Sequence, residues 1–126
     1  MDGDTIRVLH DGKREKVRLA RIDCPEYRQP YWRSAKNFTN SLVYGEMVTI
    51  KVKKKDRDGR TVGEVILSDG RNLGEELIKA GLAWHYKRYS KREELDALEK
   101  EARDRKRGLW SDPDPISPWE WREEYH

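Results

Sequence analysis

Cysteine is almost absent from this sequence, in which Cys24 stands alone. A single thiol forms no internal disulfide and builds no zinc site by itself. The three histidines, His10, His85 and His126, do not have the spacing of metal ligands. No apolar run approaches the roughly 18 residues that a membrane-spanning helix needs. These absences exclude an internal disulfide, a cysteine- or histidine-based metal centre and a membrane partner.

A signal peptide is also missing, because the chain opens on Met1-Asp2-Gly3-Asp4, which has the pattern of a turn. We therefore expect an upstream segment to precede these residues in the native protein. The cellular compartment is left open by the residues themselves.

The composition of the 126 residues is polar, with 40% charged and 35% hydrophobic residues. Five Trp, six Tyr and regularly spaced Val, Ile and Leu nevertheless indicate a folded chain. The length predicts one domain with a modest core. A net charge of +3 slightly favours anionic partners such as nucleic acid.

The hydrophobic pattern predicts short strands first and helices later. We expect strands at Thr5–His10, Lys16–Ile22, Met47–Lys55 and Arg60–Leu67, with turns at Asp11-Gly12 and residues 56–59. We expect helices at Pro30–Tyr44, Asn72–Ala80 and Ser90–Arg107, the last with a capping box of Ser90 and Glu93. This order predicts an α+β fold, mainly β: a five-stranded OB-type Greek-key barrel with about three α-helices. Since only four or five strands are visible, an N-terminal strand is expected to be incomplete.

Residues 1–110 form the expected domain. Residues 111–126 form a tail rich in Pro and Trp that packs on the domain or trails it.

Charged residues lie at the expected strand ends, and each alone has an ordinary explanation. Arg18 fits an edge strand, Asp23 and Glu26 fit a loop after Pro25, and Arg60 fits a hairpin. The lysines of the third strand fit a solvated face, and Cys24 fits a loop position better than a nucleophile, since no histidine is nearby in sequence.

Taken together, these charges suit the hydrolysis of a phosphodiester. Carboxylates such as Asp4 and Asp23 bind hard cations. Glu26 can orient or deprotonate a water molecule. Arg18 and Arg60 can stabilise the negative charge of the transition state. Arg18 and Asp23 are five residues apart, however, so they share one pocket only if the chain twists or bulges between them.

Five segments resemble the thermonucleases, the staphylococcal-nuclease-like family. They are DGDT at 2–5, KVRLARIDCPE at 16–26, DGRTVG at 58–63, NLGEELIKAGLAW at 72–84 and EARDRKRGLW at 101–110. The resemblance implies an OB-type barrel with calcium-dependent endonuclease activity on single- and double-stranded DNA and RNA, and 3′-phosphorylated products. It also implies a secreted or periplasmic protein, and a monomer unless strand exchange completes the barrel.

The resemblance further implies a role for each matching residue. Asp4 and Asp23 resemble the calcium carboxylates, and the backbone carbonyl of Cys24 resembles a further ligand. Glu26 resembles the residue that activates or orients the attacking water, and Arg18 and Arg60 resemble the phosphate clamps. Lys87 and Tyr89 stand where the family places two tyrosines against the nucleotide.

The chain departs from this pattern at Asp58, where the best-known members have a tyrosine, and at Lys87. An acid near the scissile phosphate repels substrate, whereas Tyr89 can still stack on a base. The alternative function is a non-catalytic module of the same fold that binds nucleic acid or protein, and a structural fragment of a larger protein is a third possibility. The presence of Asp4, Arg18, Asp23, Glu26 and Arg60 favours the enzyme.

Overall fold

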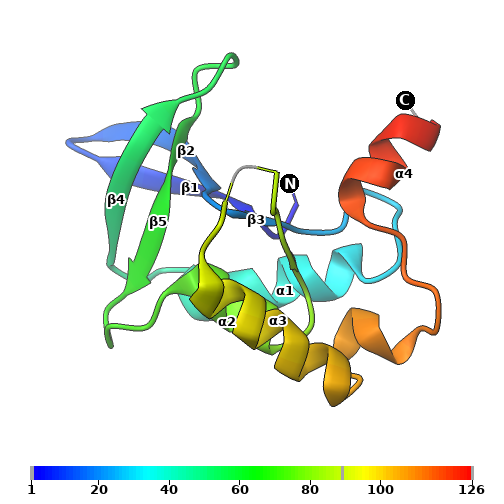
Figure 1. Cartoon of the computed structure of the whole chain (residues 1–126). Coiled ribbons are helices and arrows are strands. Elements are labelled where there is room, and N and C mark those ends of the chain that lie inside the picture. The colour runs from blue at the N-terminus through cyan, green and yellow to red at the C-terminus, as the bar shows by residue number, and fades with distance from the viewer. Residues whose placement is uncertain (1, 89, 126) are drawn as a thin grey trace.

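The computed structural model describes residues 2–88 and 90–125. Its four longer strands lie within residues 5–67. They form one sheet in the order β1-β2-β5-β4 (Figure 1). Their bounds are Thr5–His10 (β1), Lys13–Leu19 (β2), Val48–Lys55 (β4) and Thr61–Leu67 (β5). The β2–β5 pair is parallel, while β1–β2 and β4–β5 are antiparallel hairpins. Two further strands, Ile22–Asp23 (β3) and Trp84–His85 (β6), pair separately.

Both hairpin turns occur where the sequence predicts them. Asp11 and Gly12 join β1 to β2 with φ angles of 50° and 77°. Positive φ at both central residues matches the twist of the flanking strands, which explains the Asp-Gly pair. Gly59 supplies the positive φ, 79°, of the β4–β5 turn.

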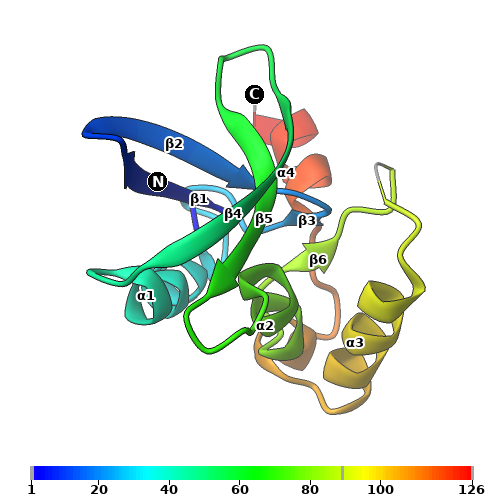
Figure 2. The same ribbon diagram turned by 90° about the vertical axis from the view of Figure 1, so that its left-hand side faces the viewer.

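The closed five-stranded barrel expected from the sequence is not confirmed. Strands β1 and β4 are the two edges of the larger sheet in the described part of the chain. Between these edges and helix α1 lies a hollow of about 1130 Å³, open towards solvent. The fold is α+β, as predicted, with an open curved sheet (Figure 2).

Four α-helices occur in the described residues, where about three were expected. They are Trp32–Val43 (α1), Leu73–Lys79 (α2), Glu93–Asp104 (α3) and Pro118–Tyr125 (α4), and a 3₁₀ turn covers Gly108–Ser111 (η1). The side chain of Asn72 caps α2 by accepting a hydrogen bond from the backbone N–H of Glu75. None of these helices is both long and apolar enough to span a bilayer.

The expected capping box of Ser90 and Glu93 is wrong. The N-cap of α3 is Arg92, which makes no side-chain capping bond. The Ser90 hydroxyl instead lies 2.7 Å from Nε2 of His85. A buried imidazole has drawn the hydroxyl away from the helix, so α3 begins at Glu93.

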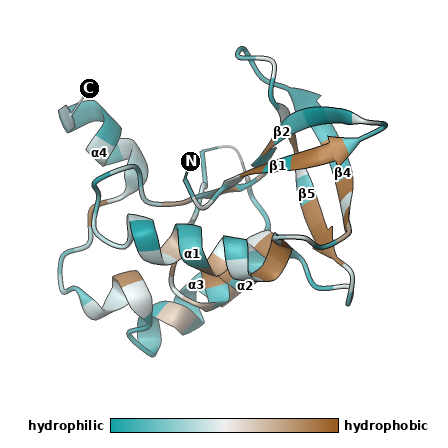
Figure 3. Cartoon of the chain, turned by 180° about the vertical axis from the view of Figure 1, so that it is seen from behind, coloured by the Kyte–Doolittle hydropathy of each residue, from teal (hydrophilic) through white to brown (hydrophobic). Residues whose placement is uncertain are grey.

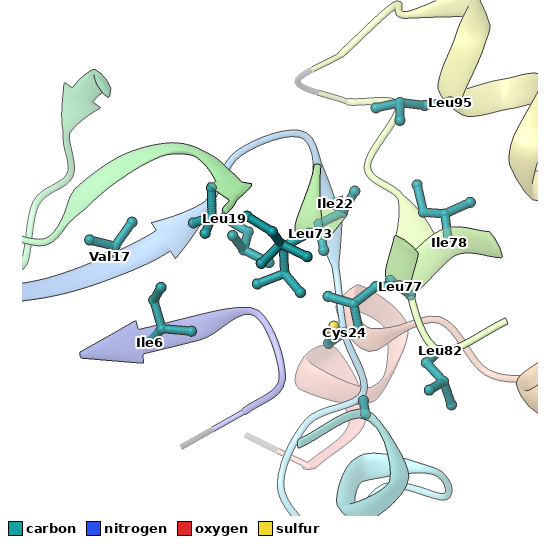
Figure 4. Close-up of a cluster of buried hydrophobic side chains, with 14 residues drawn as sticks. Ile6, Val17, Leu19, Ile22, Cys24, Leu73, Leu77, Ile78, Leu82 and Leu95 are labelled. Atoms are coloured by element: carbon teal, nitrogen blue, oxygen red, sulfur yellow. The ribbon is translucent and has the colours of Figure 1, made fainter. Parts of the chain in front are cut away.

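The core lies where α2 packs against the chain around β2 and β3 (Figure 4). Leu73, Leu77 and Ile78 of α2 are completely buried with Val17 and Ile22. Each such side chain contributes about 1.5–3 kcal/mol when it leaves water. Hydrophobic colour is plain on parts of β1, β4 and β5, whereas β2 and α4 are mostly hydrophilic (Figure 3).

Candidate active site

A break between β2 and β3 brings Arg18 and Asp23 to one side of the chain. The predicted strand Lys16–Ile22 ends instead at Leu19, and Arg21 has a φ of 70°. This left-handed residue reverses the alternation of side chains, so residues five apart meet. The Arg18 Nη2 lies 3.3 Å from Oδ1 of Asp23, while its Nη1 donates to the carbonyls of Leu19 and Ile22 at 2.6 and 3.0 Å.

Asp4 reaches the same point from the turn before β1. Its Oδ2 accepts the backbone N–H of Cys24 at 2.9 Å and lies 3.4 Å from Nη2 of Arg18. Gly3 allows this approach, because a Cβ there would lie 2.9 Å from the backbone of Ala35 in α1. The carbonyl of Gly3 accepts a bond from Thr39 Oγ1 at 2.6 Å, which fixes the turn on the helix.

Burial and charge act in opposite directions on this pair of ions. Burial raises the pKa of Asp23 to about 6, although Arg122 and Arg18 favour its ionised form. Burial lowers the pKa of Arg18, but the negative charges of Asp4 and Asp23 outweigh that effect and raise it. Both Asp23 and Arg18 are therefore mainly charged at neutral pH.

Glu26 lies beside a carboxylate that the sequence did not single out as a site residue. Burial, a hydrogen bond with Glu26 and the charge of Asp4 raise the pKa of Asp2 to about 7. Trp32 Nε1 donates to Asp2 Oδ1 at 2.8 Å. Burial opposes ionisation of Glu26, yet hydrogen bonds with Asp2 and Arg122 hold its pKa below the usual value. Glu26 is thus the ionised member of this pair, with Asp2 as its proton donor.

Arg122 of α4 is the second site residue that the sequence did not indicate. Its Nη2 lies 2.7 Å from Oδ2 of Asp23, and its Nη1 lies 3.3 Å from Oδ1 of Asp23 and 2.8 Å from Oε1 of Glu26. These contacts raise the pKa of Arg122, despite its partial burial. One guanidinium therefore joins two carboxylates for which the sequence predicted different functions.

Aromatic packing and local capping place α4 over the site. Trp119 stacks parallel on Tyr86 at 5.2 Å between ring centroids and meets Trp84 edge-on at 5.5 Å. Gln29 Nε2 donates to the carbonyl of Ile116 at 2.6 Å. Ser117 caps α4: its Oγ accepts the backbone N–H of Glu120 at 3.3 Å and donates to Glu120 Oε1 at 2.7 Å. This S-x-x-E pattern with Pro118 in the first turn is the sequence signal that predicts α4.

The remaining predicted site residues lie apart from this cluster or outside the description. The Arg60 guanidinium pairs with Asp56 at 2.8 Å and with Asp58 at 3.8 Å, both in its own hairpin turn. Lys87 pairs with Asp96 and Glu99 at 3.8 and 3.7 Å. Tyr89 lies outside the described residues. The contacts therefore bring together Asp4, Arg18, Asp23 and Glu26, and they leave Arg60 on a separate loop.

The thiol of Cys24 is not available for a reaction. Its side chain is completely buried beside α2, and burial raises the pKa of the thiol (Figure 4). A buried, protonated thiol is a poor nucleophile. The role of the Cys24 carbonyl as a metal ligand stays a prediction.

The donor chemistry of the cluster fits a hard cation. Carboxylate oxygens are the ligands that calcium prefers, and Asp4 and Asp23 are held close together. In the part of the chain that the structure describes, no group of three or more Asp, Glu, His or Cys side chains is set to hold a metal ion. Guanidinium groups lie between the carboxylates instead. The oxygens thus suit calcium, and their present arrangement is fixed by arginine.

Comparison with known proteins connects this geometry to a family. Residues 16–112 match the family described as Staphylococcal nuclease homologue. A protein of Escherichia coli named "Uncharacterized endonuclease" is 45% identical over 122 residues, covering 97% of this chain and 80% of its own. "Staphylococcal-like nuclease CAN1" of Arabidopsis thaliana is 43% identical over 110 residues, covering 87% of this chain and 34% of its own. "Protein ParB" of Escherichia coli is 38% identical over 134 residues, covering 98% and 76%. The chain, with its carboxylates and arginine gathered between β1, β2 and β3, is a nuclease that belongs to the family of staphylococcal nuclease homologues.

Proposed function

We propose that this nuclease hydrolyses phosphodiester bonds in DNA and RNA with calcium as its cofactor and leaves 3′-phosphorylated ends. The observation that supports this most directly is the cluster in which Asp4 and Asp23 lie against Arg18 while Arg122 joins Asp23 to Glu26. Two metal-type carboxylates, one further acid and one guanidinium are the set that phosphodiester hydrolysis needs.

Glu26 is proposed to act on the attacking water. Hydrogen bonds with Asp2 and Arg122 keep its pKa below the usual value, so it is ionised at neutral pH. An ionised carboxylate can accept a proton from water or orient it. Asp2 donates a hydrogen bond to Glu26 and so helps to keep the Glu26 carboxylate ionised.

Arg18 and Arg60 are proposed to bind the phosphate. Arg18 already lies against Asp4 and Asp23, so a phosphate held there lies next to the carboxylates. Arg60 has to leave Asp56 to reach the same group, and its hairpin carries it on a separate loop. Asp4, Asp23 and the carbonyl of Cys24 are the residues that would hold calcium. Calcium supplies a Lewis acid that polarises the phosphoryl oxygen.

A hollow of about 240 Å³ beside β6 is the proposed place for a neighbouring nucleotide. Aromatic and basic side chains line it, among them Trp84, Tyr86, Lys87, Arg103 and Trp119. Base stacking on aromatic rings is worth about 1–3 kcal/mol per base and tolerates any sequence. Lys87 can contribute charge to this surface. We also propose that Tyr89, as the sequence predicts, stacks on a base.

Replacing Glu26 by Gln tests the reaction. We expect cleavage of a labelled single-stranded oligonucleotide in excess calcium to fall by about 10²–10⁴-fold, because general-base assistance is lost. Glu94→Gln, an exposed position on α3, is the matched control and should cut like the parent. Equal rates for both variants would refute the proposed role of Glu26.

Calcium dependence and product chemistry are read in the same assay. A calcium chelator should abolish cleavage by the parent protein. The products should accept polymerase extension only after treatment with a phosphatase, because a 3′-phosphate blocks extension. Products that extend directly would overturn the proposed bond polarity.

A further inference from the structure

Arg122 occupies the oxygens that the proposed calcium site requires. Both carboxylate oxygens of Asp23 contact this guanidinium, at 2.7 and 3.3 Å, and Oδ1 also contacts Arg18 at 3.3 Å. The side chain of Asp23 is 1% exposed, so these contacts take the place of water around its carboxylate. Asp23 is therefore fully engaged by arginine in this structure.

The same guanidinium also engages the proposed base. Nη1 of Arg122 lies 2.8 Å from Oε1 of Glu26, at a charge-assisted hydrogen-bond distance. A water molecule activated by Glu26 needs a lone pair of this carboxylate. Arg122 thus contacts both the carboxylate proposed to bind the metal and the carboxylate proposed to activate water.

A cation and Arg122 compete for Asp23 because both are positive. Placing calcium against Asp23 with Arg122 still bonded would put two like charges within a few ångströms of each other, in a site partly shielded from water. Like charges at that distance disfavour joint occupancy. Arg18 already lies on Oδ1 of Asp23 as well, so a cation would be a third positive charge there, and its binding favours the release of one arginine.

Arg122 is the residue that can leave. Its side chain is 33% exposed, compared with 17% for Arg18, whose Nη1 is also fixed by two backbone carbonyls. Helix α4 is anchored separately through Trp119 and Ile116, so the arginine can swing without unfolding the helix. A phosphate oxygen of nucleic acid is a fitting new partner, because a guanidinium binds phosphate and carboxylate with the same fork.

We propose that α4 is an active-site latch in which Arg122 holds Asp23 and Glu26 until calcium and substrate phosphate displace it. The latch rests on the proposed calcium-dependent function and adds a regulatory element to it. While Arg122 is bound, it keeps the carboxylates of Asp23 and Glu26 compensated. Calcium affinity is then set partly by how firmly α4 is docked.

Isothermal titration with calcium alone tests the latch. Arg122→Gln removes the competing charge, and Arg33→Gln removes the same charge from an exposed position on α1. We expect Arg122→Gln to bind calcium more tightly than both the parent and Arg33→Gln, within the range of about 5–150-fold that is typical of coupled equilibria. Equal or weaker binding by Arg122→Gln would overturn the latch and leave Arg122 as a permanent part of the site.

A second variant loosens the helix without touching the guanidinium. Trp119→Ala removes the stack on Tyr86 and the contact with Trp84, so the docked state of α4 becomes less populated. Calcium affinity should again rise, by a smaller factor than in Arg122→Gln. Unchanged affinity in a folded Trp119→Ala protein would show that docking of α4 is not coupled to the cation.

The titration separates the latch from the proposed function. If the parent and all variants bind calcium equally, the latch fails and the calcium site stands. If none of them gives a binding signal, calcium is not the cofactor, and the latch proposed for it falls as well. A cooperative urea transition shows that each variant is folded; if Arg122→Gln does not fold, Trp119→Ala decides.

Discussion

At the scale of single residues, Arg60 is held by its own turn. Asp56 accepts the backbone N–H groups of Asp58 and Arg60 at 3.0 and 2.9 Å, and its second oxygen pairs with the Arg60 Nε at 2.8 Å. The Arg60 side chain is 35% exposed, so this pair costs little to open. In the proposed function, Arg60 exchanges this carboxylate for a phosphate.

Arg60→Ala should separate chemistry from folding. We expect cleavage to fall by about 10³–10⁵-fold, by analogy with guanidinium groups that meet transition-state charge in phosphoryl transfer. The melting temperature should change little, because a surface ion pair contributes only about 0–1 kcal/mol. Oligonucleotide cleavage in excess calcium measures the first effect. Arg57→Ala, an exposed arginine of the same turn, is the control, and equal activity of the two variants would remove Arg60 from the site.

Asp2 makes stability depend on pH in an unusual direction. Its pKa rises from 3.8 to about 7 in the folded protein. Between these values the folded state binds the proton more strongly than the unfolded state, so the free energy of unfolding falls as the pH rises. The stabilising contribution is complete below the unfolded value and is lost as the pH passes through the folded value.

Asp2→Asn should remove this decrease of the free energy of unfolding with rising pH. Relative to the parent, the variant should gain stability as the pH is raised from about 4 to about 7, because it has no proton to lose. Urea denaturation in a calcium-free buffer at several pH values gives the comparison. Asp11→Asn, in the exposed hairpin turn, should run parallel to the parent. If the free energy of unfolding of Asp2→Asn changes with pH in the same way as that of the parent, the pKa of Asp2 is not raised by folding.

At the scale of elements, a buried histidine joins β6 to α3. His85 Nδ1 lies 2.7 Å from Asp96 Oδ1 and its Nε2 lies 2.7 Å from Ser90 Oγ, while its backbone N–H donates to Glu99 Oε2 at 2.7 Å. The order Ser-His-Asp resembles a hydrolase triad in its distances. The His85 side chain is 0% exposed and Ser90 is 8% exposed, so no substrate reaches them. The network instead fixes the segment that carries Lys87 against α3.

Ser90→Ala tests this network by stability rather than activity. The variant leaves one nitrogen of a buried imidazole without its partner, which costs about 1–3 kcal/mol. Ser34→Ala, at an exposed position of α1, should cost much less. Urea denaturation at neutral pH measures both. A Ser90→Ala protein as stable as Ser34→Ala would show that the hydroxyl only fills space.

The elements that the sequence predicts well are those with local causes. The Asp-Gly hairpin, the β4–β5 hairpin and α2 follow from turn residues and apolar periodicity, and they lie close to their expected bounds. The two-residue strands β3 and β6 have no period to detect. The start of α3 moved because Ser90 bonds His85, a tertiary contact that competes with capping. Helix α4 did have a local signal in Ser117-Pro118-Trp119-Glu120, whereas the target of Arg122 had none, since its partners are 96 and 99 residues away in sequence.

At the scale of the whole molecule, the candidate site draws on distant parts of the chain. Asp2 and Asp4 come from the first turn, Arg18 to Glu26 from the β2–β3 segment, and Arg122 from α4. The match to the family covers residues 16–112, so both early carboxylates and the α4 arginine lie outside it. The division into a domain of residues 1–110 and a tail therefore separates Arg122 from the carboxylates that it binds. That boundary stays a prediction, as do the monomeric state and a secreted or periplasmic location.

Removal of calcium should leave the whole fold intact. The main core, centred on Ile22, Leu73 and Leu77, is apolar, and Arg18 and Arg122 compensate the proposed metal carboxylates beside it in the absence of a cation. We expect one cooperative thermal transition in a calcium chelator. Calcium should then raise the melting temperature through binding alone, by the equivalent of about 2.7 kcal/mol at a hundred times the Kd. Differential scanning calorimetry across a calcium series measures this, with magnesium as the comparison, because magnesium demands a stricter octahedral geometry and releases its waters reluctantly. Loss of the cooperative transition in the chelator would show that the cation, rather than arginine, balances Asp4 and Asp23 in the folded protein.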